Sequence, residues 1–129
     1  MDLNQVTLTV DDMPAAIGFY EALGLRCIVH THERYARFEL PCGSTTLSLH
    51  LGDRPKDGGP LLYFETEDVD ARFAALSAKG VAFEGAPEDK SWRWREAWFR
   101  DPAGNRLCLY HAGPDRRFPP WREEGRRSG

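Results

Sequence analysis

Several features that mark common protein classes are missing from this sequence. It has three cysteines among 129 residues, an odd number without C-x-x-C spacing, which argues against a disulfide framework and against a zinc ribbon. It has no apolar run near the roughly 20 residues that cross a bilayer, and its N-terminus lacks the residue order of a secretory signal. We therefore expect a cytoplasmic protein that does not bind a membrane.

An excess of positive charge is also missing. Lysine and arginine number 17 against 20 acidic residues, which gives a formal net charge of -3. Nucleic-acid binding generally needs a basic surface, so no nucleic-acid partner is predicted. No glycine-rich phosphate loop precedes a helix, which disfavours a nucleotide cofactor. With 41% hydrophobic residues, the composition is that of one ordinary globular domain or of two smaller units that share a core.

The most informative feature that is present is an internal repeat. Residues 5–24 align with residues 61–80, and Asp12 falls on Asp68 at a constant offset of 56 positions. Each copy combines an alternating apolar strand, an acidic N-cap, an amphipathic helix and a terminal glycine. A long period that occurs twice predicts two copies of one supersecondary unit, which must pair to close a core.

Each copy is predicted to be a β-α-β-β-β unit with a helix of roughly 12 residues. We assign residues 1–52 to the first unit, 53–60 to a linker, 61–112 to the second unit and 113–129 to a C-terminal tail. Within the tail, two bulky aromatics favour docking of residues 118–122 onto the sheet, and residues 123–129 are expected to be disordered. After the helices, strands are expected at 25–32, 34–40, 45–51, 81–86, 95–100 and 106–111.

The repeat, with its helix caps and turn residues, resembles the vicinal oxygen chelate superfamily, the group of glyoxalases, bleomycin-resistance proteins and extradiol dioxygenases. The resemblance rests on VTLTVDDMPAAIGFYEALGL, LYFETEDVDARFAALSAKG and FRDPAGNRLCLYH, in this order and at this spacing, and covers about residues 3–112. It implies an α+β fold in which two β-α-β-β-β modules form a U-shaped mixed-sheet cleft, with the helices outside. Homodimerisation is a further implication of the family.

Strand alternation then assigns side chains to the cleft, because successive residues point to opposite faces. In the first unit Leu47, Leu49 and Leu51 are expected in the core. We expect the cleft, and so the ligand-binding residues, to include Gln5, Thr7, Ser48, His50, Leu61, Tyr63, Trp92, Trp98, Cys108 and Tyr110.

The metal ligands of the family correspond by motif to Gln5, Ser48, Leu61 and Cys108. Leucine cannot coordinate an ion, and the remaining amide, hydroxyl and thiol would leave a divalent cation poorly neutralised. We therefore expect no metal and no other cofactor. The alternative is a divalent metal, such as zinc, at a nonstandard site built from Gln5, His50 and Cys108.

The segment SWRWREAWFR places three tryptophans, at 92, 94 and 98, on one face of an extended chain. Their large apolar area must cover either a core or a flat ligand, and both alternatives remain open. No residue is assigned a catalytic role with certainty; the candidates are His50, Glu65 and Cys108.

Three functions follow from these observations. The first is a small-molecule-binding protein, similar to bleomycin-resistance proteins and so associated with antibiotic resistance, that sequesters an aromatic or amphipathic ligand in a metal-free cleft. The second is a metal-dependent glyoxalase-like lyase or isomerase, or an extradiol-type dioxygenase, with a nonstandard site. The third is an accessory protein-interaction domain that uses the tail and the tryptophans.

Overall fold

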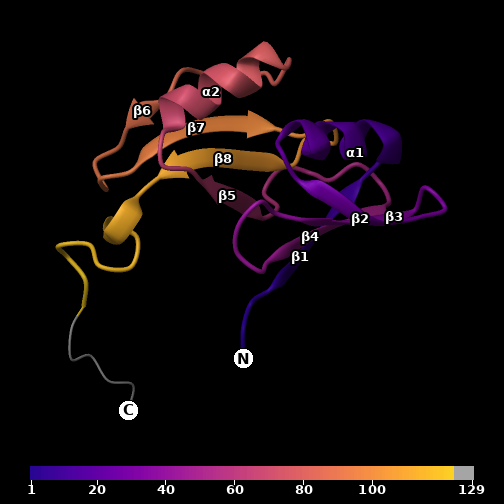
Figure 1. The fold of residues 1–129 in the computed structure, drawn as a ribbon, viewed down its shortest axis with the longest axis horizontal. Coiled ribbons are helices and arrows are strands. Elements are labelled where there is room, and N and C mark those ends of the chain that lie inside the picture. The colour runs from indigo at the N-terminus through magenta and orange to yellow at the C-terminus, as the bar shows by residue number, and fades with distance from the viewer. Residues whose placement is uncertain (124–129) are drawn as a thin grey trace.

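The computed structural model describes residues 1–123 and contains two four-stranded mixed sheets and two helices, as the α+β prediction required (Figure 1). In each sheet the first strand pairs in parallel with the last, and the other pairs are antiparallel. The first sheet has the order β1-β4-β3-β2, with β1 (Gln5–Val10), β2 (Arg26–Thr31), β3 (Tyr35–Glu39) and β4 (Thr46–Leu51). The second has the equivalent order β5-β8-β7-β6, with β5 (Leu61–Glu65), β6 (Glu88–Asp89), β7 (Arg95–Arg100) and β8 (Arg106–His111).

The two helices, α1 (Met13–Ala22) and α2 (Val69–Ala78), begin directly after the predicted N-caps Asp12 and Asp68 and are slightly shorter than the roughly 12 residues expected. Asp12 Oδ1 accepts a hydrogen bond from the backbone N–H of Ala15 at 3.1 Å, and Asp68 caps α2 in the same way. Gly24 follows α1 with a φ of 100°, a left-handed conformation that glycine adopts without strain. Each helix has 10 residues.

One hydrophobic core joins the two units. Both helices lie on the same side of the sheets, above them in Figure 1, and α1 contacts both units. The fully buried ring of Tyr20 packs 5.9 Å from Phe38 of the first sheet, while Phe19 packs 6.1 Å from Phe99 of the second. The opposite face of each sheet therefore lacks a helix.

A polar contact also joins the units at the turn between β7 and β8. Tyr20 Oη donates a hydrogen bond of 2.7 Å to Asp101 Oδ2. Asn105 Nδ2 donates both to Asp101 Oδ2 at 2.9 Å and to the carbonyl oxygen of Thr9 in β1 at 3.0 Å. The sequence predicted only a hairpin turn here, whereas the turn also connects α1, β1 and the second sheet.

Two local predictions were wrong. The strand expected at 81–86 is replaced by an isolated bridge between Phe83 and Phe99, and the edge strand β6 lies further along the chain. Gly85 and Pro87 interrupt this segment, and the Phe83 ring turns inward to pack against Phe99. Leu51, expected in the core, is 39% exposed because it ends its strand beyond the cover of α1.

The C-terminal tail begins with the short 3-10 helix η1 (Gly113–Asp115) and leads away from the sheets (Figure 1). Phe118 and Trp121 are 58% and 57% exposed, so the expected docking of residues 118–122 is not found. The Arg122 guanidinium covers the Phe118 ring at 4.3 Å, which gives this ring a local partner instead. Of the segment 123–129, residues 124–129 lie outside the described residues.

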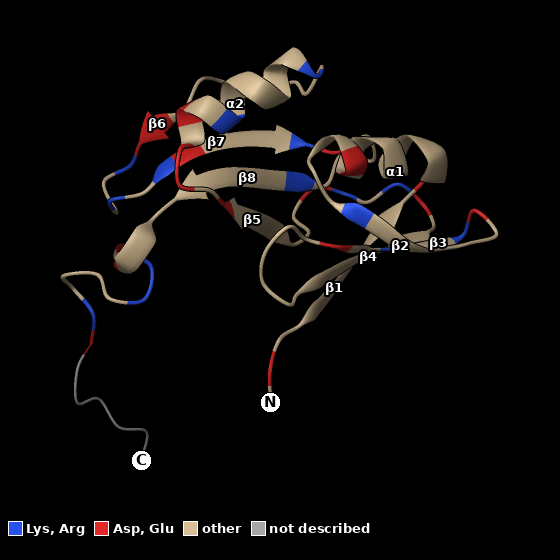
Figure 2. Cartoon of the chain, viewed as in Figure 1, with Lys and Arg blue, Asp and Glu red and all other residues tan. Residues whose placement is uncertain are grey.

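Residues of both charge signs lie at strand ends, in turns and in the tail of the described chain (Figure 2). None of the helices within residues 1–123 is long and apolar enough to span a membrane.

Candidate ligand-binding site

The helix-free face of the second sheet carries three rows of side chains. Strand register aligns residues of β5, β8 and β7, and the alternate residues Leu107, Leu109 and Phe99 belong to the common core. The side chains between them therefore point to the other face. The rows are Leu61–Arg106–Arg100, Tyr63–Cys108–Trp98 and Glu65–Tyr110–Glu96.

Four rings on this face form a continuous surface, which we call the aromatic wall: Tyr63, Trp94, Trp98 and Tyr110. The Tyr63 ring lies 5.5 Å from both Trp98 and Tyr110 and meets them edge to face. Trp94 packs 4.8 Å from Tyr110. The wall belongs to a hydrophobic cluster separate from the main core, and Tyr63 is 44% exposed. The wall therefore presents aromatic surface outside the core.

A buried carboxylate fixes the tryptophans at one end of the wall. Glu96 is 5% exposed, and its two oxygens accept hydrogen bonds from indole N–H groups, at 2.7 Å from Trp92 and 3.0 Å from Trp98. The three tryptophans thus gather on one face, on the side away from the main core. Sequence reasoning missed Glu96, although its alternation with Trp94 and Trp98 was the available signal.

Two predicted ligand contacts are buried instead of exposed on this face: Cys108 lies beneath the wall, and Tyr110 is the covered ring within it. Cys108 is fully buried, and burial, reinforced by the nearby Glu96 carboxylate, raises the pKa of its thiol to about 12. A thiol with this pKa stays protonated at neutral pH, so it is poorly suited to nucleophilic attack. Tyr110 is also buried, under Trp94 and Tyr63. The predicted alternation is correct for both, but the large neighbouring rings cover them.

The corresponding face of the first sheet is polar. Tyr35 Oη lies 2.8 Å from Ser48 Oγ and accepts a hydrogen bond of 2.9 Å from Arg37 Nε. Partial burial acts to raise the pKa of Tyr35, but the interactions with Ser48 and Arg37 outweigh burial and lower it. Ser48, expected to contact ligand, is fully buried beneath this cluster. Tyr35 and Arg37 were not predicted, although they alternate with the core residues Ala36 and Phe38.

Gln5, Thr7 and His50 lie on the polar face as alternation predicted, but they are not gathered at one point. The register pairs Gln5 with Thr46, four residues before His50 on β4, which corresponds to roughly 13 Å along the strand. Thr9 Oγ1 lies 2.7 Å from His50 Nε2, so His50 already has a partner. Gln5 and His50 therefore cannot readily hold the same ion.

The family's metal positions do not fit a metal ion in this chain. Leu61 has no ligating atom, Cys108 is fully buried, and Ser48 bonds Tyr35. Within residues 1–123 no three His, Cys, Asp or Glu side chains come together as a possible ion site.

Glu65, a candidate proton carrier, has a structural partner. Its Oε2 accepts hydrogen bonds from the backbone N–H groups of Ala112 at 2.7 Å and Gly113 at 2.9 Å. The carboxylate thus holds the chain where β8 leads into η1.

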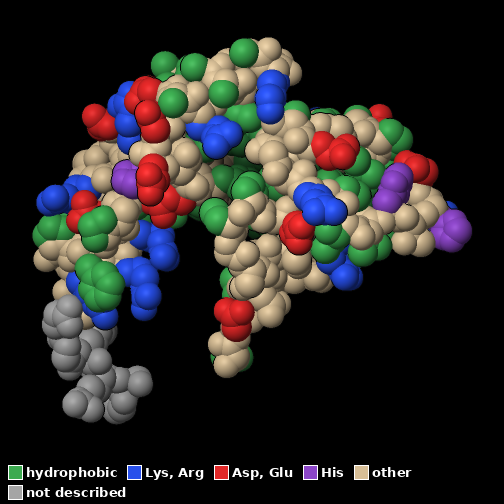
Figure 3. Space-filling view, in the orientation of Figure 1, with side chains coloured by type: hydrophobic (Ala, Val, Ile, Leu, Met, Phe, Trp, Pro, Cys, Tyr) green, Lys and Arg blue, Asp and Glu red, His purple; other side chains and the backbone are tan. Residues whose placement is uncertain are grey.

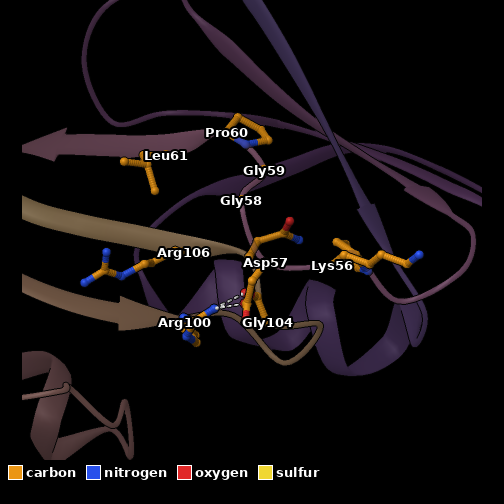
Figure 4. A pocket seen from close by; sticks show the side chains of 11 residues that line it. Lys56, Asp57, Gly58, Gly59, Pro60, Leu61, Arg100, Gly104 and Arg106 are labelled. Atoms are coloured by element: carbon orange, nitrogen blue, oxygen red, sulfur yellow. Dashed lines mark hydrogen bonds and ion pairs between the residues drawn. The ribbon is translucent and has the colours of Figure 1, made fainter.

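The surface is hollowed beside the aromatic wall. Figure 3 shows a hollow that opens between the second unit with its tail and the N-terminal strand of the first unit. A cavity of about 390 Å³ lies where the linker passes the strand ends of the second sheet, lined by residues 55–60 together with Leu61, Arg100, Gly104, Asn105 and Arg106 (Figure 4). Leu61 and Arg106 belong both to this cavity and to the row next to the aromatic wall.

Comparison with known proteins agrees with this architecture. The sequence profile of the Glyoxalase/Bleomycin resistance protein/Dioxygenase superfamily matches residues 2–109. The uncharacterized protein YraH of Bacillus subtilis is 35% identical over 127 residues, which cover 85% of this chain and 98% of that protein.

Solved structures share the fold. A superfamily member from Sphaerobacter thermophilus is 28% identical, with a TM-score of 0.71 over 86% of this chain and 97% of its own. A lactoylglutathione lyase from Agrobacterium tumefaciens has a TM-score of 0.70 over 85% of this chain and 92% of its own, at 22% identity, which shows likeness of fold alone.

Proposed function

Because this chain belongs to the glyoxalase/bleomycin resistance protein/dioxygenase superfamily, we propose that it binds a small aromatic or amphipathic molecule against the aromatic wall, without a metal ion. The ligand is held and sequestered, not transformed, and an antibiotic is one such ligand. The observation that carries the proposal is the wall itself, because it presents aromatic surface on a face that no helix covers.

The energetics of the wall support ligand binding. Tyr63 of the wall leaves 44% of its surface exposed, as does Trp92 beside the wall, and contact of such rings with water is unfavourable. A flat molecule that stacks on them would bury apolar area and gain edge or face contacts of about 0.5–1.5 kcal/mol per ring pair. Glu96 keeps the indole rings of Trp92 and Trp98 in place, so little side-chain entropy remains to be lost on binding.

The chemistry of the metal positions supports a metal-free site. A lyase, isomerase or dioxygenase of this fold would need a metal ion that polarises vicinal oxygens, and among the positions that would hold it Leu61 has no ligating atom and Cys108 is fully buried. We expect native protein to contain well below one transition metal per chain by elemental analysis. Stoichiometric zinc, iron, nickel or manganese that a chelator removes together with activity would contradict the proposal.

We also expect the chain to form a homodimer. Apolar side chains remain exposed on the helix-free side of the second sheet, among them Leu61 and Tyr63. A second copy that packs against this face would cover them and enclose the ligand.

Removal of one exposed ring tests the wall. Tyr63→Leu keeps an apolar residue on β5 but removes the ring, so the affinity for 2-naphthalenemethanol, followed by naphthalene fluorescence or calorimetry, should fall about tenfold. Phe118→Leu is the matched control, because it removes an even more exposed ring from the tail and should leave the affinity unchanged. Equal affinities of both variants and the parent protein would contradict a role for the wall, as would failure of the parent protein to bind.

A further inference from the structure

Two arginines lie opposite each other at one end of the aromatic wall. Arg106 of β8 pairs in register with Arg100 of β7, and both side chains point to the helix-free face. Like charges directly opposite on neighbouring strands destabilise a sheet unless something compensates them. The Arg106 guanidinium also lies 4.2 Å from the centre of the Trp98 ring, so its positive charge is directly next to the aromatic wall.

The cavity beside these arginines is continuous with the wall. Leu61 and Arg106 line the cavity and form one row with Arg100, directly next to the row that contains Tyr63 and Trp98. Its volume of about 390 Å³ is within the range of small-molecule sites. In Figure 4 the two arginines and Leu61 lie on the side of the cavity toward the sheet, while Lys56 points away from them.

The carboxylates that compensate the two arginines come from residues outside the strands of the sheet, and one of these carboxylates is almost fully exposed to solvent. Arg106 bonds Glu84 through Nε and Nη2, each at 3.2 Å. Arg100 Nη1 bonds Asp57 Oδ1 at 3.2 Å, but the Asp57 side chain is 90% exposed and stands next to Gly58 and Gly59 in the linker. An exposed ion pair of this kind contributes little to stability, so an incoming anion can replace it.

We propose that this cavity is the anion-binding end of the ligand site, and that the ligand is a flat aromatic molecule with a carboxylate or phosphate group. This inference rests on the proposed function and specifies its ligand class. The aromatic part stacks on Tyr63 and Trp98, and the anion takes the position of the Asp57 carboxylate beside Arg100 and Arg106. Arginine suits this role because its planar fork can donate two parallel hydrogen bonds to either group. Asp57 thus acts as an internal competitor in the free protein.

A set of probes with one ring system separates the two ends of the site. 2-Naphthoate, 2-naphthyl phosphate, 2-naphthalenemethanol and 2-naphthylmethylammonium share the ring and differ in charge. We expect one of the anions to bind at least tenfold more tightly than the alcohol at low salt, with the advantage reduced at 0.5 M NaCl, and the ammonium compound to bind most weakly. The stronger anion identifies carboxylate or phosphate as the preferred group.

Variants assign the effect to the cavity. Arg100→Gln, which leaves the wall rings untouched, should remove most of the anion's advantage over the alcohol. Asp57→Asn should tighten anion binding about threefold, because the competitor is lost. Arg26→Gln, which removes an exposed arginine 4.0 Å from Glu39 on the first sheet, is the matched control and should change neither.

The outcomes distinguish this inference from the proposed function. If the alcohol binds and the anions bind no better, or if Arg100→Gln and Arg26→Gln behave alike, the anion site is wrong and the aromatic wall stands. Tightest binding of the ammonium compound would likewise overturn the anion site, in favour of Asp57 or Glu96 as the recognising charge. If no naphthalene probe binds the parent protein, both proposals are wrong.

Discussion

At the scale of single residues, Asp101 stabilises both the turn between β7 and β8 and the contact between the two units. Its carboxylate is buried and accepts hydrogen bonds from the Tyr20 hydroxyl, from the Asn105 side chain and from the backbone N–H groups of Ala103 and Asn105. A buried charge is tolerated only when it is well hydrogen-bonded. The bond from Tyr20 also runs between the two units, so Asp101 stabilises their association as well as the turn.

Loss of this carboxylate should be costly. We expect Asp101→Ala to lower the free energy of unfolding by about 3 kcal/mol or more, because several donors lose their acceptor in the interior. Tyr20→Phe removes one bond and should cost about 1–2 kcal/mol. Urea denaturation of the two variants checks the order; an Asp101→Ala variant as stable as the parent would show that the turn holds without this carboxylate.

The buried thiol of Cys108 predicts a loss of stability at alkaline pH. Its pKa is about 12 in the folded chain, against an ordinary value near 9. Below pH 9 the thiol is protonated in both states; between pH 9 and 12 the unfolded chain loses the proton more readily, so stability falls as pH rises. Urea midpoints from pH 8 to 11 should fall less steeply for Cys108→Ala than for Cys42→Ala, which changes an exposed cysteine. Parallel slopes would contradict the assignment. Burial also raises the pKa of Tyr63 and Tyr110, so part of the decline should remain.

At the scale of elements, the helices and seven of the strands follow from the sequence because their signals are local. Alternation marks β1 and β8, and an aspartate N-cap with a glycine after the C-terminus brackets α1 and α2. The short edge strand β6 was misplaced because its position depends on pairing with β7 and on the inward turn of Phe83. Edge pairing is a tertiary contact that leaves little trace in a two-residue strand.

The N-caps offer a test at this scale. Asp12→Ala and Asp68→Ala should each lower the free energy of unfolding by about 1 kcal/mol, since one backbone N–H per helix loses its acceptor. Asp68→Ser should retain most of the stability, because serine also caps helices. Asp2→Ala, at the exposed N-terminus, is the control for charge, and a loss there equal to the cap variants would point to a charge effect instead.

At the scale of the whole molecule, one core shared by both units explains why the repeat occurs twice. α1 contacts Phe38 of its own sheet and Phe99 of the other, so neither unit buries its apolar face alone. The helices occupy one side and leave the ligand face of each sheet open, which is the physical basis for expecting a dimer.

Light scattering after size-exclusion chromatography checks this expectation. The dimer has twice the 14.7 kDa of the chain. Leu61→Lys places a charge on the exposed apolar face and should shift the equilibrium toward the monomer, whereas Leu3→Lys, near the exposed N-terminus, should not. A parent protein that remains monomeric at all concentrations would contradict dimerisation.

Truncation of the exposed tail tests, at the same scale, whether the chain is an accessory protein-interaction domain. Truncation after Arg116 removes Phe118 and Trp121 but keeps η1 and its contacts with Glu65. We expect unchanged dimerisation and unchanged binding of 2-naphthalenemethanol. Loss of either would assign the tail a role in assembly or in the site.

The sequence by itself determined the repeat, the capped helices, the alternation of nearly every strand and the superfamily, because all of these depend on neighbours a few positions apart or on a pattern that recurs. Only the tertiary structure decided which alternating residues reach the surface. Ser48, Cys108 and Tyr110 have the predicted orientation but lie under rings from other strands. It also decided that Tyr35 meets Arg37 and Ser48, that Glu96 holds two indoles, and that Arg100 and Arg106 stand side by side at a cavity. Strand periodicity fixes the face of a side chain, whereas its burial and partners depend on the strand that pairs beside it.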